Sequence, residues 1–370
     1  MSSLTRPRIL LLIPHLGGGG SERVIETLAR VLNPAKYDVH LALITDSHLD
    51  YLSHLTIPVH SLRAERVRHS GLRLLRLIWK LRPRLILSGI AHLNLLVLAL
   101  KPILPRGTRI IVRQNGAVAE TLRSHCRHLS RRLYSLAYRR ADRVICQTGA
   151  MSHELQLDLR VEPAMLAVLP NPTDISYIRS RTLPDQKQIT ASPTLVAIGR
   201  LVPEKGFDLL LDAIASLPSP HQSTELFLVG TGPQKCSLQR QARELGIESR
   251  IHFVGHIPDP IIQFHHASLF VLSSRTEGLP NALLEAAAAG LPIVATPASD
   301  GLLDLLQHRE GVWLASEISS AALRAALQQA LSAIGHGRRY PHDWMEPYEL
   351  SRAVAAYESV IDRVIVGSAT

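Results

Sequence analysis

Short apolar runs alternate with segments of helical periodicity through most of the 370-residue chain. The run Arg8 to Ile13, for example, is followed by the segment Ser21 to Leu32, in which apolar residues recur at three- and four-residue spacing. The alternation breaks around Pro172 and restarts at Thr194. Buried parallel strands connected by helices produce this pattern, so we predict an α/β fold with two parallel sheets, each covered by helices on both faces.

The break between the two alternating halves predicts the domain organisation. The pattern breaks around Leu169-Pro-Asn-Pro172, and the stretch Arg179 to Pro193 is polar with two prolines, which is typical of a linker. Two such runs on either side of a linker predict two doubly wound domains that face each other across a cleft. In such sheets, ligands bind at the carboxyl ends of the strands. The expected parts are an N-terminal domain of residues 1–172, a linker of 173–193, a second domain of 194–346 and a C-terminal helix within 347–370.

The two halves of the chain differ in charge. Residues 1–170 contain 25 Lys and Arg against 11 Asp and Glu, whereas residues 171–370 contain 16 against 20. A basic half can attract nucleic acid, an anionic membrane or a phosphate-bearing acceptor. Only 4% of residues are aromatic, too few for a base-stacking platform, and no nucleic-acid-binding motif is present, so we expect no nucleic-acid partner. A basic surface that only favours solubility stays an alternative.

Cysteine content and hydropathy suggest a cytoplasmic protein. The three cysteines, Cys126, Cys146 and Cys236, are far apart in the sequence, which favours a reducing compartment without disulfides or structural zinc. A membrane span needs about 20 apolar residues, and the most apolar stretch, Leu85 to Leu104, is interrupted by polar and charged residues. We read the apolar run at the N-terminus as a buried strand, because it is too short for a signal peptide.

A run of four glycines, Gly17 to Gly20, lies between the first predicted strand and the first predicted helix. Backbone amides at such a turn, together with the helix N-terminus, can approach an anion or a bulky polar ligand. The spacing matches neither the dinucleotide-binding fingerprint nor the P-loop. A tight turn without a ligand is therefore the alternative interpretation.

The second half opens with two cations on a strand-to-helix turn, Arg200 and Lys205. Two cations held on such a turn can neutralise a diphosphate. Solvated surface charges are the alternative.

Two glutamates eight positions apart, Glu277 and Glu285, flank the start of a later predicted helix, which we expect to begin at Pro280. Glu277 would precede the helix and Glu285 would lie in its second turn, while the amides from Gly278 to Ala282 could meet a phosphate. Carboxylates on both sides could accept hydrogen bonds from sugar hydroxyls. Alternatively, one glutamate is present only because the helix dipole favours a negative charge near the helix start, and the other is an ordinary exposed residue.

Other reaction classes have no supporting motif. No two Asp are separated by a single residue, so a D-x-D clamp for a metal and a diphosphate is missing. The histidines around His125 and His265 have no second pair at zinc spacing, so we expect no metal.

Taken together, these residues resemble the retaining GT-B glycosyltransferases of carbohydrate-active family four, over essentially the whole chain. The family's R-x-x-x-x-K-G signature is matched from Arg200 to Gly206 and its E-x7-E motif from Glu277 to Glu285. Asn171-Pro172 resembles the family's pair at the domain junction, and Gly230-Thr-Gly232-Pro233 its nucleotide-side loop. The family's Gly-Gly-x-x-Glu loop is matched only loosely, by Gly18 to Glu22.

The resemblance implies roles for individual residues. Arg200 and Lys205 would hold the donor diphosphate, Glu285 the ribose hydroxyls and Glu277 the transferred sugar. His92 resembles a histidine of the acceptor domain near the sugar, which makes Arg200, Lys205, Glu277 and His92 the expected catalytic set. The expected donor-binding set is Gly18, Gly19, Gly20, Arg200, Lys205, Gly230, Gly232, Glu277, Gly278, Leu279, Pro280, Asn281 and Glu285. Arg113 and Asn115 are expected on the acceptor side.

The implied activity is retaining transfer of a hexose or N-acetylhexosamine from a nucleotide-diphosphate sugar, most often UDP-linked, without metal or other cofactor. The acceptor would be a hydroxyl of a lipid-linked (polyprenyl-diphosphate) or growing saccharide, in polysaccharide or surface glycan biosynthesis. A non-catalytic sugar-nucleotide or glycan-binding protein and a nucleotide-sugar epimerase on the same fold are the alternatives.

A cluster of basic residues in the first half suits an anionic membrane surface, so we expect peripheral association with the inner face of the cytoplasmic membrane. The cluster consists of Arg63, Arg66, Arg68, Arg73, Arg76, Lys80, Arg82 and Arg84. By the same resemblance, the last helix would pack back onto the first domain.

Overall fold

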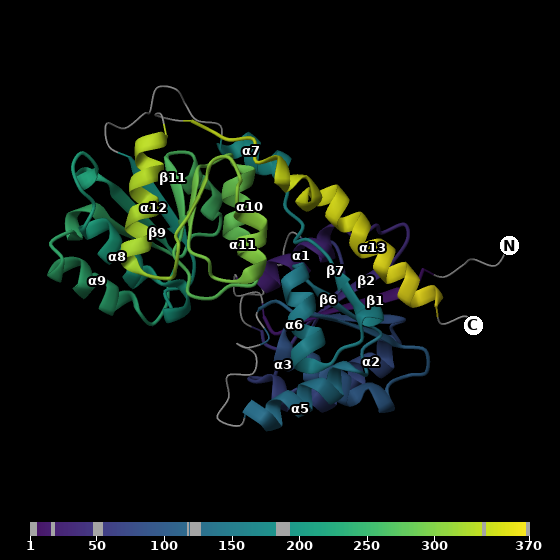
Figure 1. The fold of residues 1–370 in the computed structure, drawn as a ribbon. Coiled ribbons are helices and arrows are strands. Elements are labelled where there is room, and N and C mark those ends of the chain that lie inside the picture. Colours follow the sequence, from purple (N-terminus) through teal and green to yellow (C-terminus); the bar gives the residue numbers. More distant parts are fainter. Residues whose placement is uncertain are drawn as a thin grey trace. The chain divides into compact units, whose positions relative to one another are not determined.

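The computed structural model describes residues 6–15, 19–46, 55–116, 118, 127–182, 193–334 and 338–367. The chain divides into two compact units (Figure 1). The first comprises Met1–Pro172 and Leu350–Thr370, and the second comprises Thr173–Glu349. Each unit is a parallel sheet with helices on both faces, as the alternation of apolar runs and helical segments predicts.

The first unit contains a seven-stranded sheet in the order β3-β2-β1-β4-β5-β6-β7. Its strands are β1 (Arg8–Ile13), β2 (Asp38–Leu43), β3 (Val59–Ser61), β4 (Leu85–Ser88), β5 (Arg109–Arg113), β6 (Arg143–Cys146) and β7 (Leu166–Val168). Its helices are α1 (Gly20–Val31), α2 (Gly71–Leu81), α3 (Ala91–Leu100), α5 (Arg127–Tyr138), α6 (Gly149–Leu159) and α13 (Leu350–Val366). The direction of strand addition reverses between β1 and β4, which is the usual place for ligands in such sheets.

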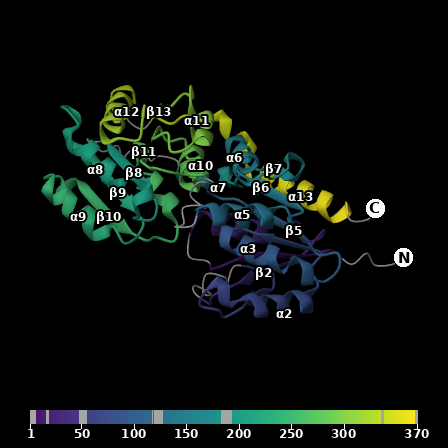
Figure 2. The same cartoon turned by 60° about the horizontal axis from the view of Figure 1, so that its bottom comes forward.

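Side chains alternate across the first sheet and form two cores. Leu10 and Leu12 pack with α2, α3, α5 and α6, whereas Ile9 and Leu11 pack with α1 and α13. Figures 1 and 2 show α2, α3 and α5 on the side of the sheet away from α13. Tyr357 of α13 is fully buried in the second of these cores, so the last helix is an integral part of the first unit.

The second unit contains a six-stranded sheet in the order β10-β9-β8-β11-β12-β13. Its strands are β8 (Thr194–Ile198), β9 (Glu225–Val229), β10 (Ile251–Gly255), β11 (Leu269–Leu272), β12 (Ile293–Ala295) and β13 (Val312–Leu314). Its helices are α7 (Ile175–Thr182), α8 (Phe207–Ala215), α9 (Lys235–Glu244), α10 (Asn281–Ala288), α11 (Asp300–Leu306) and α12 (Ser320–Ala333). Strand addition reverses here between β8 and β11.

The segment expected to be a linker contains a helix that the sequence analysis did not predict. In α7, Ile175 and Ile178 lie three positions apart and are buried in a core of the second unit with α10. The amide of Thr173 also donates to the carbonyl of Tyr348 within this unit. Of the polar stretch Arg179 to Pro193, on which the linker prediction rested, residues 183–192 lie outside the described residues.

None of the helices in the described ranges is long and apolar enough to cross a membrane.

Candidate functional site

Three loops meet at the carboxyl edge of the second sheet, next to the reversal between β8 and β11. They are residues 199–206 after β8, 230–234 after β9 and 273–280 after β11. Backbone hydrogen bonds join them: the amide of Leu201 donates to the carbonyl of Thr231 at 2.9 Å, and the amide of Arg275 to that of Glu204 at 2.7 Å. The sheet thus gathers residues that are far apart in the sequence into one group of loops.

Glycines allow these loops to approach each other closely. Gly206 has a φ of +61°, and a Cβ there would lie 2.1 Å from the carbonyl oxygen of Ser273. Gly230 has a φ of +140°, and its Cβ would lie 1.9 Å from the carbonyl oxygen of Gly199. At Gly232 the corresponding distance, to the oxygen of Leu201, is 2.4 Å. Because real Cβ atoms do not approach backbone that closely, the predicted donor-binding residues Gly230 and Gly232 have at least a role in loop packing.

Lys205 and Glu277 form an ion pair between the loops after β8 and β11. The Glu277 carboxylate is nearly buried, with 9% of the side chain exposed, and it also accepts a hydrogen bond from Ser274 Oγ at 2.6 Å. The Lys205 side chain is 22% exposed. Two residues of the expected catalytic set, 72 positions apart, are thus in direct contact.

Arg200 lies in the same loop as Lys205, and its side chain is exposed. Within the described part of the chain, no hydrogen bond or ion pair of its guanidinium is found. A Cβ on the neighbouring Gly199 would lie 3.4 Å from Cδ of Lys205, so the Lys205 stem passes directly over that residue. The loop therefore presents one exposed cation and one paired cation.

The helix that carries Glu285 begins directly after the loop of Glu277. Helix α10 starts at Asn281 with Pro280 as its N-cap, and Gly278 and Leu279 before it are buried. Glu285 lies in the second turn, as predicted, and is buried rather than exposed. An ordinary exposed glutamate, the alternative interpretation for Glu285, is therefore wrong. The N-terminal end of a helix stabilises negative charge, so this end can receive an anion.

Further predicted residues belong to the first unit. Gly19 is the N-cap of α1, which begins at Gly20, while Gly18 lies outside the described residues. Glu22, in the first turn, is buried, and a Cβ on Gly19 would lie 2.2 Å from its Oε2. The glycine thus leaves room for the carboxylate over the helix start, where a negative charge is stabilised.

His92 is the second residue of α3 and is exposed at the surface of the first unit. Partial desolvation of the ring lowers the pKa of His92 below its usual value, against the opposing effect of the Glu22 charge. The imidazole is therefore mostly neutral at pH 7, a state in which one ring nitrogen donates and the other accepts a hydrogen bond.

Arg113, expected on the acceptor side, is fully buried. Its Nε donates to the hydroxyl of Tyr357 at 3.1 Å, and its Nη atoms donate to the side-chain oxygens of Asn115 and Asn171. Asn115 donates in turn to the carbonyl of Gly89. Arg113 thus connects β5 with α13 and with the segment before Pro172. Its burial argues against direct contact with an acceptor.

Arg275 and Asp208, neither of which was predicted from the sequence, form a pair that connects the loops of the second unit. The two guanidinium Nη atoms donate to the two carboxylate oxygens at 2.7 and 2.6 Å. Arg275 belongs to none of the motifs considered above, and nothing local relates it to a residue 67 positions earlier. Arg275 follows β11 and Asp208 follows β8, and these strands are neighbours in the sheet. A correct prediction of the strand order would therefore have indicated that the two residues lie close together.

Two family models match consecutive parts of the chain. The model described as "Glycosyltransferase Family 4" matches residues 18–177, and "Glycosyl transferases group 1" matches residues 180–340. The chain belongs to the family-four glycosyltransferases. The resemblance inferred from the motifs is thereby confirmed.

Individual relatives of the family are similar over shorter stretches. An uncharacterized glycosyltransferase of Haemophilus influenzae is 36% identical over 124 residues, 34% of this chain and 35% of the relative. The GPI3 subunit of phosphatidylinositol N-acetylglucosaminyltransferase from Saccharomyces cerevisiae is 28% identical over 198 residues, 52% of this chain and 43% of the relative. The chain thus spans less than half the length of these curated relatives.

A solved structure covers nearly the whole chain. HepE of Anabaena, in complex with UDP and glucose, superimposes with a TM-score of 0.81 at 18% identity, over 96% of this chain and all of that one. The predicted fold class, GT-B with two doubly wound Rossmann-like domains, is confirmed.

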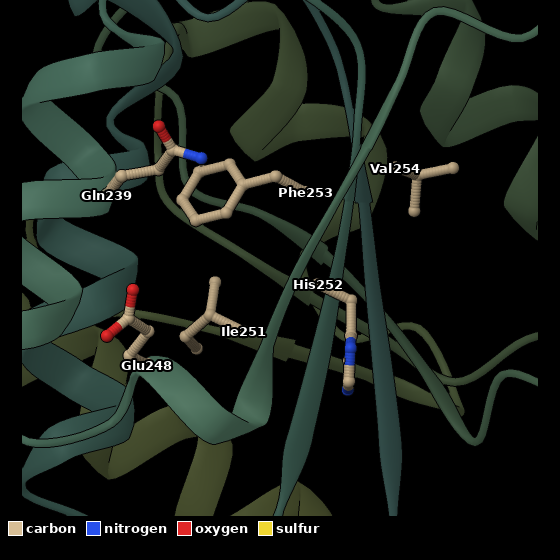
Figure 3. A pocket seen from close by; sticks show the side chains of 6 residues that line it. All are labelled: Gln239, Glu248, Ile251, His252, Phe253 and Val254. Carbon is tan, nitrogen blue, oxygen red and sulfur yellow. The ribbon is translucent and has the colours of Figure 1, made fainter.

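An open pocket of about 430 Å³ lies beside the edge strand β10 of the second unit (Figure 3). It is separate from the loops after β8, β9 and β11 that are described above. Residues of α9, β10 and the turn between them line it, and Figure 3 shows Phe253 beside Gln239. None of the predicted site residues is among the lining residues. Within the described ranges, no three His, Cys, Asp or Glu side chains gather as a metal site would require.

Proposed function

We propose that the chain transfers a sugar from a nucleotide-diphosphate donor to an acceptor hydroxyl, with retention of configuration and without a metal. The observation that carries this proposal is the Lys205–Glu277 ion pair beside the exposed Arg200, on loops at the carboxyl edge of the second sheet. Here the cations face a diphosphate, and Glu277 accepts hydrogen bonds from hydroxyls of the transferred sugar. Membership of the family and the buried Glu285 in α10 support the same arrangement.

The chemistry needs charge stabilisation more than a protein nucleophile. As the bond between C1 of the sugar and the diphosphate oxygen breaks, the leaving group gains negative charge. Lys205, Arg200 and the first-turn amides of α10 stabilise that charge more strongly in the transition state than in the bound donor. The acceptor oxygen forms its bond to C1 on the same face, and its proton passes to the departing phosphate. The neutral imidazole of His92 serves as a hydrogen-bond partner of the sugar.

We propose UDP as the nucleotide and a hexose or N-acetylhexosamine as the sugar. A structure with this fold holds UDP and glucose, and a relative is named for N-acetylglucosamine transfer to phosphatidylinositol. We further propose a lipid-linked or growing saccharide as the acceptor, in the biosynthesis of a polysaccharide or surface glycan. The phosphatidylinositol in the relative's name supports a lipid-linked acceptor.

We also propose that α2 attaches the first unit to the inner face of the cytoplasmic membrane. Its surface exposes Leu72 by 71% and Trp79 by 48%, seven positions apart and therefore on one face of the helix. Arg73, Arg76 and Lys80 are exposed beside them. Apolar side chains surrounded by cations are typical of helices that lie on anionic lipid.

Vesicle co-sedimentation tests this attachment. The full chain should bind phosphatidylglycerol vesicles at low salt, and a Leu72→Ser/Trp79→Ser variant should bind much less. Val366→Ser, which changes an exposed residue of α13, is the matched control and should bind like wild type. Absence of wild-type binding would refute the attachment.

The nucleotide and the activity are tested in two steps. A thermal-shift screen with UDP-, GDP- and ADP-sugars should show a raised melting temperature with a UDP-sugar, because a ligand that binds only the folded state stabilises it. Release of UDP from that donor should then be measured with and without saccharide acceptors. Stabilisation without turnover would favour a binding protein, and conversion of the sugar without release would favour an epimerase.

A further inference from the structure

The bidentate pair of Arg275 and Asp208 joins the two loops that carry Lys205 and Glu277. Lys205 ends a short 3₁₀ turn, Pro203–Lys205, and Asp208 lies in the first turn of α8 immediately after it. Arg275 lies two residues before Glu277. Besides Asp208, its Nη1 reaches the carbonyl of Pro203 at 2.9 Å. One guanidinium thus holds the residues on both sides of Lys205.

Main-chain contacts extend this connection. The amide of Arg275 donates to the carbonyl of Glu204 at 2.7 Å, and Ser273 Oγ donates to the carbonyl of Lys205 at 2.9 Å. Gly206 allows the turn to lie directly against the Ser273 carbonyl. The backbone of Lys205 is consequently fixed relative to the loop of Glu277 by contacts from three successive turn residues.

The energetics favour a local rather than a global role for this pair. The side chains of Arg275 and Asp208 are 37% and 36% exposed, and ion pairs at such exposure contribute little to overall stability. Two parallel N–H···O bonds nevertheless fix direction as well as distance, which a lysine in the same place would not do. The hydrogen bonds from Arg275 lower the pKa of Asp208 below its usual value, so the carboxylate stays charged at neutral pH.

We infer that Arg275 is a positioning residue that, through Asp208 and the carbonyl of Pro203, holds Lys205 where it meets the donor diphosphate. This inference rests on the proposed function for its ligand. Arg275 acts through Lys205 and does not itself contact the nucleotide, so its contribution should disappear when Lys205 is absent.

A double-mutant cycle on the full chain tests this dependence, with UDP as the titrant in calorimetry. Arg275→Gln and Lys205→Ala should each weaken UDP binding, by about 10- to 100-fold, since a hydrogen bond to a charged group contributes a free energy of that size. The double variant should bind no more weakly than Lys205→Ala alone. Effects that multiply would overturn the inference, because Arg275 would then act independently of Lys205.

Arg240→Gln is the matched control, because Arg240 is an exposed arginine of the same unit that pairs only with Glu244 on its own helix among the described residues. It should bind UDP like wild type. Arg275→Lys, which keeps the charge but not the two parallel bonds, should lie near Arg275→Gln. Recovery of wild-type affinity by Arg275→Lys would contradict positioning by geometry.

Amide hydrogen exchange provides a readout that needs no nucleotide. In Arg275→Gln, residues 201–206 should exchange faster, whereas β8 and β11 should exchange as in wild type and in Arg240→Gln. Unchanged exchange at 201–206 would overturn the inference even if UDP binds. If wild-type protein binds no UDP, the proposal of UDP as the nucleotide fails, and the exchange result still decides whether Arg275 holds the turn.

Discussion

Lys205, in the loop after β8, forms a hydrogen-bonded ion pair with Glu277, in the loop after β11. Glu277 accepts a second hydrogen bond from Ser274. A diphosphate that binds to Lys205 must therefore compete with the Glu277 carboxylate for the positive charge of the lysine. The nearby Glu277 carboxylate also repels the diphosphate. Under the proposed function, Glu277 consequently lowers affinity for the nucleotide alone, while its carboxylate lies beside the sugar.

Glu277→Gln should separate these two effects. The amide keeps an oxygen that can accept from Ser274 but loses the negative charge, so affinity for UDP should rise by about 3- to 10-fold, as expected for removal of one partly screened repulsion. Sugar transfer should fall by about 100-fold, because the charged acceptor of the sugar hydroxyls is lost. Calorimetry with UDP and an assay of UDP release measure the two quantities. Weaker UDP binding in this variant would contradict the assigned charge relationship.

Gly206→Ala should cost more stability than the same change at Gly246. Both glycines have positive φ, +61° and +69°, so each alanine carries backbone strain of about 1–2 kcal/mol. A Cβ at Gly246 meets nothing within 4 Å, whereas at Gly206 it would meet the Ser273 carbonyl at 2.1 Å. Urea unfolding should therefore show an additional loss of at least about 1 kcal/mol for Gly206→Ala. Equal losses would show that the loops do not need this close approach.

Stability of the second unit should fall with acidification because of His342. Burial lowers the pKa of His342 below its usual value of 6.5, and the ring donates from Nε2 to the carbonyl of Leu291 at 2.8 Å. Below about pH 6.5 the unfolded imidazole takes up a proton while the folded one stays neutral, so stability decreases as pH falls towards the folded pKa.

His342→Asn should flatten this pH dependence, since asparagine tolerates the left-handed backbone found at position 342. Urea unfolding at a series of pH values between 5 and 8 measures the slope. An unchanged slope in His342→Asn would assign the acid sensitivity to other groups.

The strand-to-helix units could be predicted from local sequence. So could the positions of Lys205 in a loop after a strand and of Glu285 in the second turn of a helix, because both depend only on spacing within one loop or helix. The pairing of Arg275 with Asp208 could not, since it depends on β8 and β11 being neighbours in the sheet. Arg113 shows the same limit. It was expected on the acceptor side because it ends a strand, but it is buried and donates to the hydroxyl of Tyr357, 244 positions later.

Helix α7 escaped prediction for a different reason. Its eight residues are mostly polar, and only Ile175 and Ile178 pack into the core, so the periodic signal is too short to distinguish it from the polar residues that follow.

Lys205→Ala offers the most direct test of the central claim that the loops of the second unit stabilise a leaving diphosphate. Turnover of the UDP-sugar identified by the thermal-shift screen should fall by about 100-fold or more, corresponding to roughly 3 kcal/mol of transition-state stabilisation. The melting temperature should change far less, because the lysine is partly exposed and Ser274 still supports Glu277. Wild-type turnover by a variant of wild-type stability would contradict the claim.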